Sequence, residues 1–154
     1  MSLLNQKAPS FELLDQDGNT RRLSDYAGKK ILLYFYPKDD TPGCTAEACS
    51  FRDSLNDLKQ SDIQVIGVSC DSVASHKKFA EKFHLNFPLL ADTDKKLVEA
   101  YGVWKQKSMF GKKYMGIQRD SFLIDENGVV VKHYEKVNPL TQVKHILKDI
   151  ASMG

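Results

Sequence analysis

The fold is decided by the stretch Ile31-Leu32-Leu33-Tyr34-Phe35-Tyr36, which is followed by Pro37-Lys38-Asp39-Asp40-Thr41-Pro42-Gly43-Cys44. A run of apolar and aromatic residues without alternation is typical of a strand that is buried on both faces of a parallel sheet. From Cys44 to Lys59, apolar residues recur every three or four positions, which predicts one face of a helix. These residues are Ala48, Phe51, Leu55 and Leu58. The sequence therefore predicts a buried strand that passes through a short loop into a helix.

The rest of the chain alternates predicted strands and helices, as judged from apolar periodicity and turn residues. Upstream we expect a β-hairpin with strands at 10–14 and 20–23. Downstream we expect, in order, a buried strand at 65–69, a helix at 72–83, an extended segment at 87–91, a helix ending at Gly102, a mixed loop and incoming strand at 103–117, a hairpin of 119–124 with 129–134, and a helix opened by Asn138 and Pro139. This order predicts an α/β, thioredoxin-like fold: a central mixed sheet flanked by helices, with an N-terminal β-hairpin extension.

Length and composition predict one ordinary globular domain spanning residues 1–154. The net charge of +2 is too weak to indicate nucleic-acid binding. No apolar stretch approaches the roughly 20 residues of a membrane span, and residues 1–7 lack the apolar core of a signal peptide. Three cysteines do not make a secreted disulfide framework. We therefore expect a cytoplasmic protein, in which paired cysteines are usually catalytic or metal-binding.

Cys44 falls where the buried strand gives way to the helix N-terminus. The N–H groups at a helix start are unsatisfied and carry the positive end of the helix dipole. This environment lowers the pKa of a cysteine and raises its thiolate fraction, and the thiolate is the nucleophile. With Cys49 following five residues later, the stretch is interpreted as a redox site.

Two separated motifs resemble one protein family. Pro37-x-x-x-Thr41-x-x-Cys44 resembles the active-site motif of peroxiredoxins, and Thr41-Pro42-Gly43-Cys44-Thr45-x-Glu47-x-Cys49-x-Phe51-Arg52 resembles their peroxiredoxin Q group, also called bacterioferritin comigratory proteins. Arg119-x-Ser121-Phe122-Leu123-Ile124-Asp125 is similar to the second signature of that group. The resemblance covers nearly the whole chain. It implies a thiol-dependent peroxidase for hydrogen peroxide and organic hydroperoxides, active in antioxidant defence and redox homeostasis, without metal, haem or flavin.

The resemblance also implies the catalytic residues. Cys44 would attack the peroxide O–O bond and become a sulfenic acid, and Cys49 would resolve it as an intramolecular disulfide. The Thr41 hydroxyl would hydrogen-bond the sulfur and the peroxide, and Arg119 would supply a fixed cation. Thioredoxin is the expected reductant. Because the resolving pair lies within one chain, no dimer is needed and we expect a monomer.

Four further residues are expected to support the active site. Pro37 and Pro42 stiffen the loop and, by similarity, shield the sulfur. Gly43 contributes a backbone N–H group at the helix start. Glu47 has two equally weighted interpretations: a first-turn partner of the helix dipole, or a residue that orients an arginine.

The spacing of Cys44 and Cys49 has a geometric consequence. Five residues of α-helix separate two Cα atoms by roughly 8.7 Å, whereas a disulfide requires no more than about 7 Å. Both cysteines therefore cannot remain helical and be bonded. We predict that the first turns of the helix unwind between peroxide reduction and disulfide formation.

Other candidates receive structural interpretations. Cys70 is expected to be a packed small residue, and residues 105–113 a solvated basic loop. The four histidines have no ligand spacing and are taken as structural or surface residues, namely His76, His84, His133 and His145.

Three other functions remain as alternatives. A thioredoxin-like disulfide reductase predicts a C-x-x-C motif and usually a cis-proline before the strand opposite the active site. Here the spacing is C-x4-C, and no proline lies between Pro88 and Pro139. A zinc- or copper-binding module requires a histidine placed beside the two thiols, and none is marked as a ligand. A purely structural domain leaves the Pro37–Cys44 motif unexplained.

Overall fold

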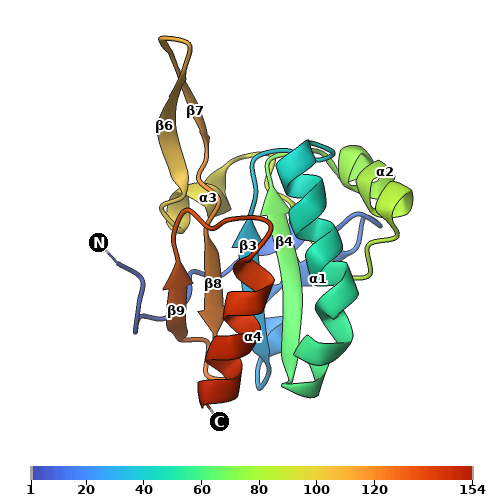
Figure 1. Cartoon of the computed structure of the whole chain (residues 1–154), viewed down its shortest axis with the longest axis vertical. Coiled ribbons are helices and arrows are strands. Elements are labelled where there is room, and N and C mark those ends of the chain that lie inside the picture. Colours follow the sequence, from blue (N-terminus) through green and yellow to red (C-terminus); the bar gives the residue numbers. More distant parts are fainter. Residues whose placement is uncertain (1, 154) are drawn as a thin grey trace.

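The computed structural model describes residues 2–153 and contains a mixed five-stranded sheet in the order β5-β4-β3-β8-β9 (Figure 1). Strands β3, β4 and β5 are parallel, whereas β8 pairs antiparallel with both β3 and β9. The strands are β3 (Lys30–Phe35), β4 (Ile63–Ser69), β5 (Leu89–Ala91), β8 (Ser121–Ile124) and β9 (Val130–Tyr134). The predicted thioredoxin-like arrangement, with a mixed sheet between helices, is confirmed.

Helices cover both faces of this sheet. They are η1 (Leu23–Tyr26), α1 (Pro42–Gln60), α2 (Val73–Phe83), α3 (Lys96–Ala100) and α4 (Gln142–Met153). Helices α1 and α4 lie side by side on one face, as Figure 1 shows. The expected N-terminal hairpin is present as β1 (Glu12–Leu14) and β2 (Thr20–Arg22). Among the described residues, no helix is both long enough and apolar enough to cross a membrane.

Strand β3 contributes to two hydrophobic cores, one on each face of the sheet. Leu32, Tyr34 and Tyr36 pack with α1 and α4, whereas the alternate residues 31, 33 and 35 pack with α3 and the N-terminal segment. Side chains alternate between the faces of a strand. Both faces are covered here, which explains the solid apolar run in the sequence and confirms its interpretation.

Helix α1 begins at Pro42, two residues before the predicted start at Cys44. Thr41 is the N-cap residue in an extended conformation, and Pro42 occupies the first turn, where a missing N–H group costs nothing. The predicted inward face is confirmed by the burial of Ala48, Phe51, Leu55 and Leu58. Because α1 joins the parallel strands β3 and β4, these three elements form a βαβ unit.

The prediction of a loop and an incoming strand at 103–117 is only partly right, and the prediction of a basic loop at 105–113 is wrong. These residues form a β-hairpin of β6 (Trp104–Met109) and β7 (Lys112–Ile117), which stands away from the central sheet (Figure 1). Phe110 and Gly111 both have positive φ, as a two-residue hairpin turn of type I′ requires. Because most side chains on both faces of the hairpin are exposed, no apolar alternation marks its strands in the sequence.

The last helix also begins later than predicted. Asn138 Oδ1 accepts a hydrogen bond from the N–H of Leu140, and the Asn138 carbonyl accepts from Thr141 and Gln142. These bonds close a turn over residues 138–141, so α4 starts at Gln142 rather than at Pro139. Val143 and Ile146 form the buried face of this helix.

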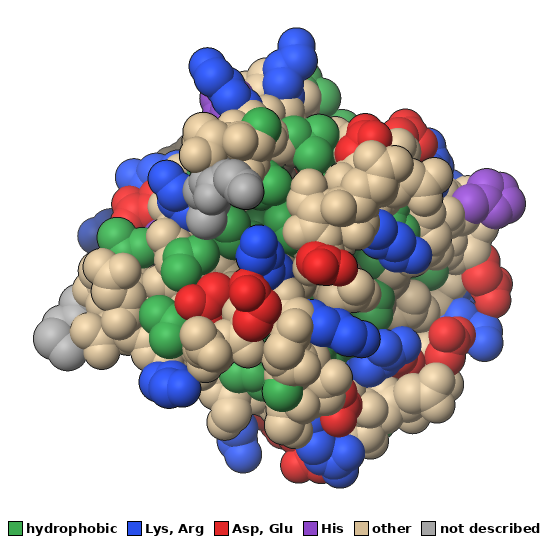
Figure 2. All heavy atoms as spheres, turned by 90° about the horizontal axis from the view of Figure 1, so that it is seen from below, with side chains coloured by type: hydrophobic (Ala, Val, Ile, Leu, Met, Phe, Trp, Pro, Cys, Tyr) green, Lys and Arg blue, Asp and Glu red, His purple; other side chains and the backbone are tan. Residues whose placement is uncertain are grey.

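The end of the molecule where α4 finishes is shown in Figure 2. Basic and acidic side chains are interspersed over this face. The N-terminus of α1 lies at the other end, beside the base of the β6–β7 hairpin (Figure 1).

Candidate active site

Cys44 lies in the first turn of α1, at the end of the sheet where β3 finishes. Its side chain is 1% exposed, and the thiol is free. The helix is continuous from Pro42 to Gln60, so the dipole and free N–H groups of its N-terminus act close to the sulfur.

Arg119 brings a cation to this sulfur from a distant part of the sequence. It precedes β8, which pairs with β3, and the N–H of Phe35 donates to the carbonyl of Asp120 over 2.8 Å. This pairing places Arg119 at the level of the α1 N-terminus, and its Nη2 lies 3.4 Å from Cys44 Sγ. A guanidinium in this position stabilises negative charge on the sulfur.

Glu47 fixes the other side of the same guanidinium. It follows Cys44 by three residues and therefore shares its helix face. Its Oε1 lies 2.6 Å from Arg119 Nη1, and the side chain is fully buried. Of the two interpretations that the sequence left open, this contact favours the orienting of an arginine.

Burial raises the pKa of Glu47 to about 7, because a charged carboxylate loses its hydration. Arg119 and Gln142 act in the opposite direction. For Arg119 itself, burial lowers the pKa, but the negative charges of Glu47 and Cys44 outweigh it and raise the pKa above its ordinary value. The cation is therefore permanent, and the site places it between a carboxylate and a sulfur.

Gln142, which has no sequence signal, and Ser121 of the second motif complete this network. Gln142 Nε2 donates to Glu47 Oε2, and Gln142 Oε1 accepts from the Ser121 hydroxyl over 2.8 Å. Both are buried, and they come from α4 and β8. A glutamine in the first turn of a helix is ordinary in a sequence, so only the packing of α4 against α1 reveals its role.

The segment that carries Arg119 is held by its neighbour Asp120. This buried carboxylate accepts hydrogen bonds from His133 Nε2 at 2.8 Å, from Gln118 Nε2 at 2.9 Å and from the N–H of Lys136 at 3.0 Å. His133 also stacks on Phe122 in β8. The structural interpretation of His133 agrees with these contacts.

Gly43 allows the guanidinium to approach the helix. A Cβ atom on Gly43 would lie 3.2 Å from Arg119 Nη2, which is closer than ordinary van der Waals contact. Pro37 and Pro42 flank the loop that leads into the helix.

A cavity of about 440 Å³ opens beside Arg119. Its lining residues are Lys105, Gln106, Lys107, Gln118, Arg119, Lys136 and Val137.

The structure does not place the Thr41 hydroxyl as the sequence suggested. The hydroxyl donates to the carbonyl of Lys38 over 2.9 Å. Among the described residues, it makes no hydrogen bond to Cys44. The reason is local: the loop from Lys38 to Thr41 turns back on itself, so the nearest acceptor is a backbone carbonyl.

The other two cysteines differ from Cys44 in environment. Cys49 lies in α1, half-buried and free. Cys70 follows β4 and packs against the core on the opposite face of the sheet from Cys44. Burial, together with Asp92, raises the pKa of Cys70 to about 11, as expected of a packed, unreactive thiol.

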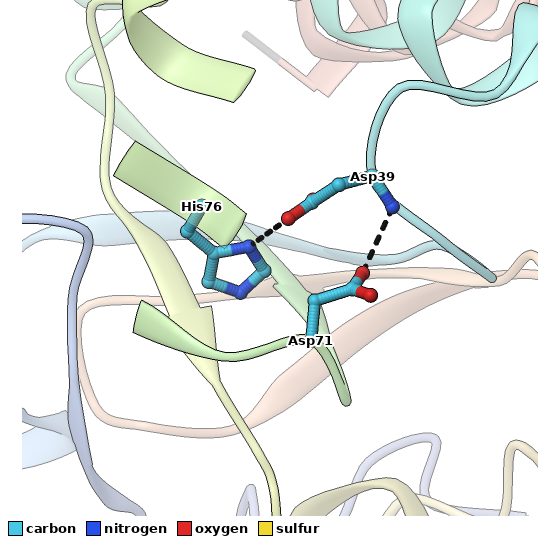
Figure 3. Close-up of side chains that lie close together, drawn as sticks. All are labelled: Asp39, Asp71 and His76. Carbon is cyan, nitrogen blue, oxygen red and sulfur yellow. Dashed lines mark hydrogen bonds and ion pairs between the residues drawn. The ribbon is translucent and has the colours of Figure 1, made fainter. Parts of the chain in front are cut away.

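One cluster has the composition of a metal site. Asp39, Asp71 and His76 offer ligand atoms that all lie within 4.8 Å of one another (Figure 3). His76 was predicted to be structural or at the surface, and it is fully buried. Its Nδ1 and the Asp39 carboxylate already bond each other at 2.7 Å, so the cluster is satisfied by its own hydrogen bonds. None of the three residues contacts Cys44 or Arg119.

Comparisons with known proteins agree on one family. The model of the AhpC/TSA family matches residues 4–133. Peroxiredoxin Bcp of Bacillus subtilis is 52% identical over 151 residues, which cover 98% of this chain and 96% of that protein. Peroxiredoxin Bcp of Escherichia coli is 50% identical over 123 residues, which cover 80% and 79% of the two chains.

A solved structure of the Xanthomonas campestris bacterioferritin comigratory protein, from a study of its alkyl peroxide reduction activity, superimposes with a TM-score of 0.88. It is 36% identical and covers 93% of this chain and 91% of that one. The fold and site are thus those of a thioredoxin-fold, thiol-dependent peroxidase. The chain belongs to the AhpC/TSA family, in its peroxiredoxin Q, or bacterioferritin comigratory protein, group.

Proposed function

We propose that Cys44 is the thiol that attacks the peroxide and that Cys49 resolves the product as an intramolecular disulfide. The substrates are hydrogen peroxide and organic hydroperoxides, and residues 1–154 act as one domain. The observation that carries the proposal is the guanidinium of Arg119, which lies 3.4 Å from a buried thiol at a helix N-terminus.

The first step transfers one oxygen atom. The Cys44 thiolate attacks one peroxide oxygen, the O–O bond breaks, and the second oxygen leaves as water or an alcohol after taking up a proton. Cys44 is thereby oxidised to a sulfenic acid. Arg119 supports this step because a fixed cation stabilises the thiolate before attack and the negative charge that moves onto oxygen during it. Glu47 holds the guanidinium in place through its other nitrogen.

The second step forms the disulfide. The Cys49 thiolate attacks the sulfenic sulfur, an S–S bond forms and the S–O bond breaks, and the oxygen leaves as hydroxide that takes up a proton to become water. Both cysteines lie in the continuous helix α1. Ideal helical geometry holds their Cα atoms roughly 8.7 Å apart, beyond the limit of about 7 Å for a disulfide. The first turns of α1 therefore unwind before the bond closes.

The third step returns the enzyme to the dithiol form at the expense of an external reductant. Thioredoxin is the proposed donor in the cytoplasm, where the enzyme serves antioxidant defence. A resolving pair within one chain needs no second subunit, so the proposal includes a monomer. Reduction of alkyl peroxides by the Xanthomonas campestris relative supports the inclusion of organic hydroperoxides among the substrates.

Thiol mapping by mass spectrometry after one equivalent of peroxide tests this proposal. Cys44→Ser should abolish peroxide reduction. Cys49→Ser should reduce one equivalent and accumulate sulfenic acid at Cys44. Cys70→Ser is the matched control and should turn over normally. Sustained turnover of Cys49→Ser with thioredoxin would transfer the resolving role to another residue.

A further inference from the structure

Asp39 is buried in the loop between β3 and α1 and accepts an unusual number of hydrogen bonds. Its Oδ1 accepts from the Tyr36 hydroxyl at 2.6 Å, and its Oδ2 accepts from the Ser75 hydroxyl at 2.8 Å and pairs with His76 Nδ1 at 2.7 Å. The N–H of Asp39 donates to Asp71 Oδ2 over 2.8 Å, as Figure 3 shows. Hydrogen bonds from its side chain and its backbone therefore hold Asp39, a residue of the active-site loop, in place.

The pair of Asp39 and His76 shares a proton. His76 Nε2 lies 2.8 Å from the carbonyl oxygen of Leu90, which can only accept, so Nε2 carries a hydrogen. Nδ1 would then be an acceptor in a neutral ring, yet it faces a carboxylate oxygen. A further proton must lie between Nδ1 and Oδ2, whichever atom carries it. A hydrogen bond that is buried from water in this way is strengthened by the low local dielectric.

The cluster is better explained as a structural tie than as a metal site. Asp39 Oδ2 and His76 Nδ1 are engaged with each other, and Asp71 Oδ2 already accepts from the Ser69 hydroxyl and the N–H of Asp39. An ion would have to displace these donors. We use the word tie for the hydrogen bonds of His76 with the Asp39 carboxylate and with the Leu90 carbonyl. It joins the active-site loop to α2, which carries His76, and to β5, which carries Leu90.

The tie ends next to an uncommon backbone conformation. Asp40 has φ of +58°, in the left-handed region that non-glycine residues seldom adopt. Thr41, the N-cap of α1, follows directly. The chain is thus fixed at Asp39 and turns sharply at Asp40 before the helix that carries Cys44 begins.

We propose that Asp39 and His76 form a positioning pair that anchors the N-terminal end of α1, and that unwinding toward Cys49 is confined to the chain after Asp39. The inference rests on the proposed function, because it concerns the helix that carries both thiols. Neither residue touches the sulfur or the peroxide. Their effect is on the balance between the helical form, which reacts with peroxide, and the open form, which closes the disulfide.

Loss of the tie should change the population of the open form and the rate of disulfide formation, whereas the rate of Cys44 oxidation should change little. Without the tie, unwinding is no longer confined to the chain after Asp39, so the open form gains the backbone freedom of about one further residue and becomes about tenfold more populated. Disulfide formation then accelerates about tenfold, because only the open form can close the bond. Peroxide oxidation of Cys44 changes less than about twofold, because the helical form is still the majority.

The test uses His76→Gln, in which a single amide nitrogen cannot reach both Asp39 and the Leu90 carbonyl. Rapid-quench thiol mapping gives the rates of Cys44 oxidation and of disulfide formation. Amide hydrogen exchange in the reduced protein follows residues 45–49, where opening should also rise about tenfold. Ser75→Ala removes one hydrogen-bond donor to Asp39 and keeps His76, so disulfide formation and the opening of residues 45–49 should each rise about threefold. This variant replaces His76→Gln in the test if His76→Gln does not fold.

Ser72→Ala is the matched control. Ser72 caps α2 by accepting from the N–H of Ser75, without contacting Asp39. Its loss weakens the same helix and should leave both the rates and the exchange of residues 45–49 unchanged. If Ser72→Ala and His76→Gln gave equal changes, the pair would be only structural and the proposal wrong.

Stoichiometric zinc binding by the wild type, lost in His76→Gln, would also overturn the proposal, because the ion would replace the shared proton. The exchange measurement needs no peroxide. It therefore tests the tie even if thiol mapping shows no disulfide between Cys44 and Cys49 and so refutes the proposed function.

Discussion

The Glu47 carboxylate and the Arg119 guanidinium meet 2.6 Å apart across 72 positions of sequence, and Glu47 is completely buried. The same guanidinium lies 3.4 Å from Cys44 Sγ through its other terminal nitrogen. The carboxylate thus sets the direction in which the cation faces the thiol. Removal of one member of a buried ion pair leaves the other charge uncompensated, so the pair affects both folding and chemistry.

Replacement of Arg119 by Met should slow peroxide oxidation of Cys44 about a hundredfold, the loss typical of removing one stabilising donor from a reacting centre. It should also destabilise the fold by about 3 kcal/mol, because Glu47 is left buried without a cation. Quench-flow thiol mapping and urea unfolding measure the two effects. Arg22→Met, which removes an exposed pair with Glu12, is the control and should change neither. An unchanged rate of oxidation in Arg119→Met would contradict the assigned role.

Glu47 should make stability depend on pH between about 4.5 and 7. Its pKa in the folded protein is raised to about 7 from an ordinary value of 4.5, so in this range the folded state binds more protons than the unfolded state. The contribution of Glu47 to the free energy of unfolding is therefore full below pH 4.5 and falls as pH rises toward 7, by about 3 kcal/mol at most.

Urea unfolding of the wild type and of Glu47→Gln from pH 4.5 to 8 measures this dependence. Other groups titrate in both proteins, so the difference between the two curves isolates Glu47. The stability of the wild type relative to the variant should decline with pH up to about 7 and then level off. A difference that rises with pH would show that burial does not dominate at this carboxylate.

Tyr34 in β3 and Tyr36, which directly follows the strand and packs in the same core, should respond differently to loss of the hydroxyl. The Tyr34 hydroxyl is buried and has no partner among the described residues, whereas the Tyr36 hydroxyl donates to Asp39 over 2.6 Å. Tyr34→Phe should leave stability unchanged or raise it by about 1 kcal/mol, and Tyr36→Phe should lower it by about 1–3 kcal/mol. Urea unfolding compares the two variants directly. Equal losses would mean that the Tyr34 hydroxyl has a partner that the contacts do not reveal.

Unwinding of α1 should be visible in the oxidised protein. Amide hydrogen exchange of residues 43–52 should be faster in the disulfide form than in the dithiol form, because helical hydrogen bonds around Cys44 are lost. Helix α2 is the internal control and should exchange alike in both forms. Equal protection across residues 43–52 in the two redox states would rule out the unwinding step.

The strand and helix that carry the site could be predicted because their own residues specify them. The solid apolar run of β3 and the periodic apolar face of α1 are local signals, and both are confirmed. Of the hairpin at 103–117, the sequence predicts only an incoming strand after a loop, because most side chains are exposed on both faces and apolar alternation is absent. The start of α4 was misplaced because Asn138 can cap a turn as well as a helix, and only its partners decide between them.

Within the site, the sequence was informative where residue type alone limits the chemistry. A cysteine at a helix start and a motif arginine were found, whereas Gln142 and the tie between Asp39 and His76 were not. Their roles depend on contacts across 95 and 37 positions, which no local pattern records. Glu47 lay between these cases: one of its two interpretations named an arginine as its partner, but the sequence did not decide between them.

The placement of both thiols on the continuous helix α1 has a consequence for the reduction potential. Under the proposed unwinding, the free energy that keeps the first turns helical opposes disulfide formation, so it favours the dithiol form. For a two-electron couple, about 1.4 kcal/mol corresponds to about 30 mV. Any substitution that stabilises the first turns of α1 by that amount should therefore raise the potential by about 30 mV and make the disulfide easier for a donor thiol to reduce. The stability of one helix end would thus set how readily the oxidised enzyme accepts electrons.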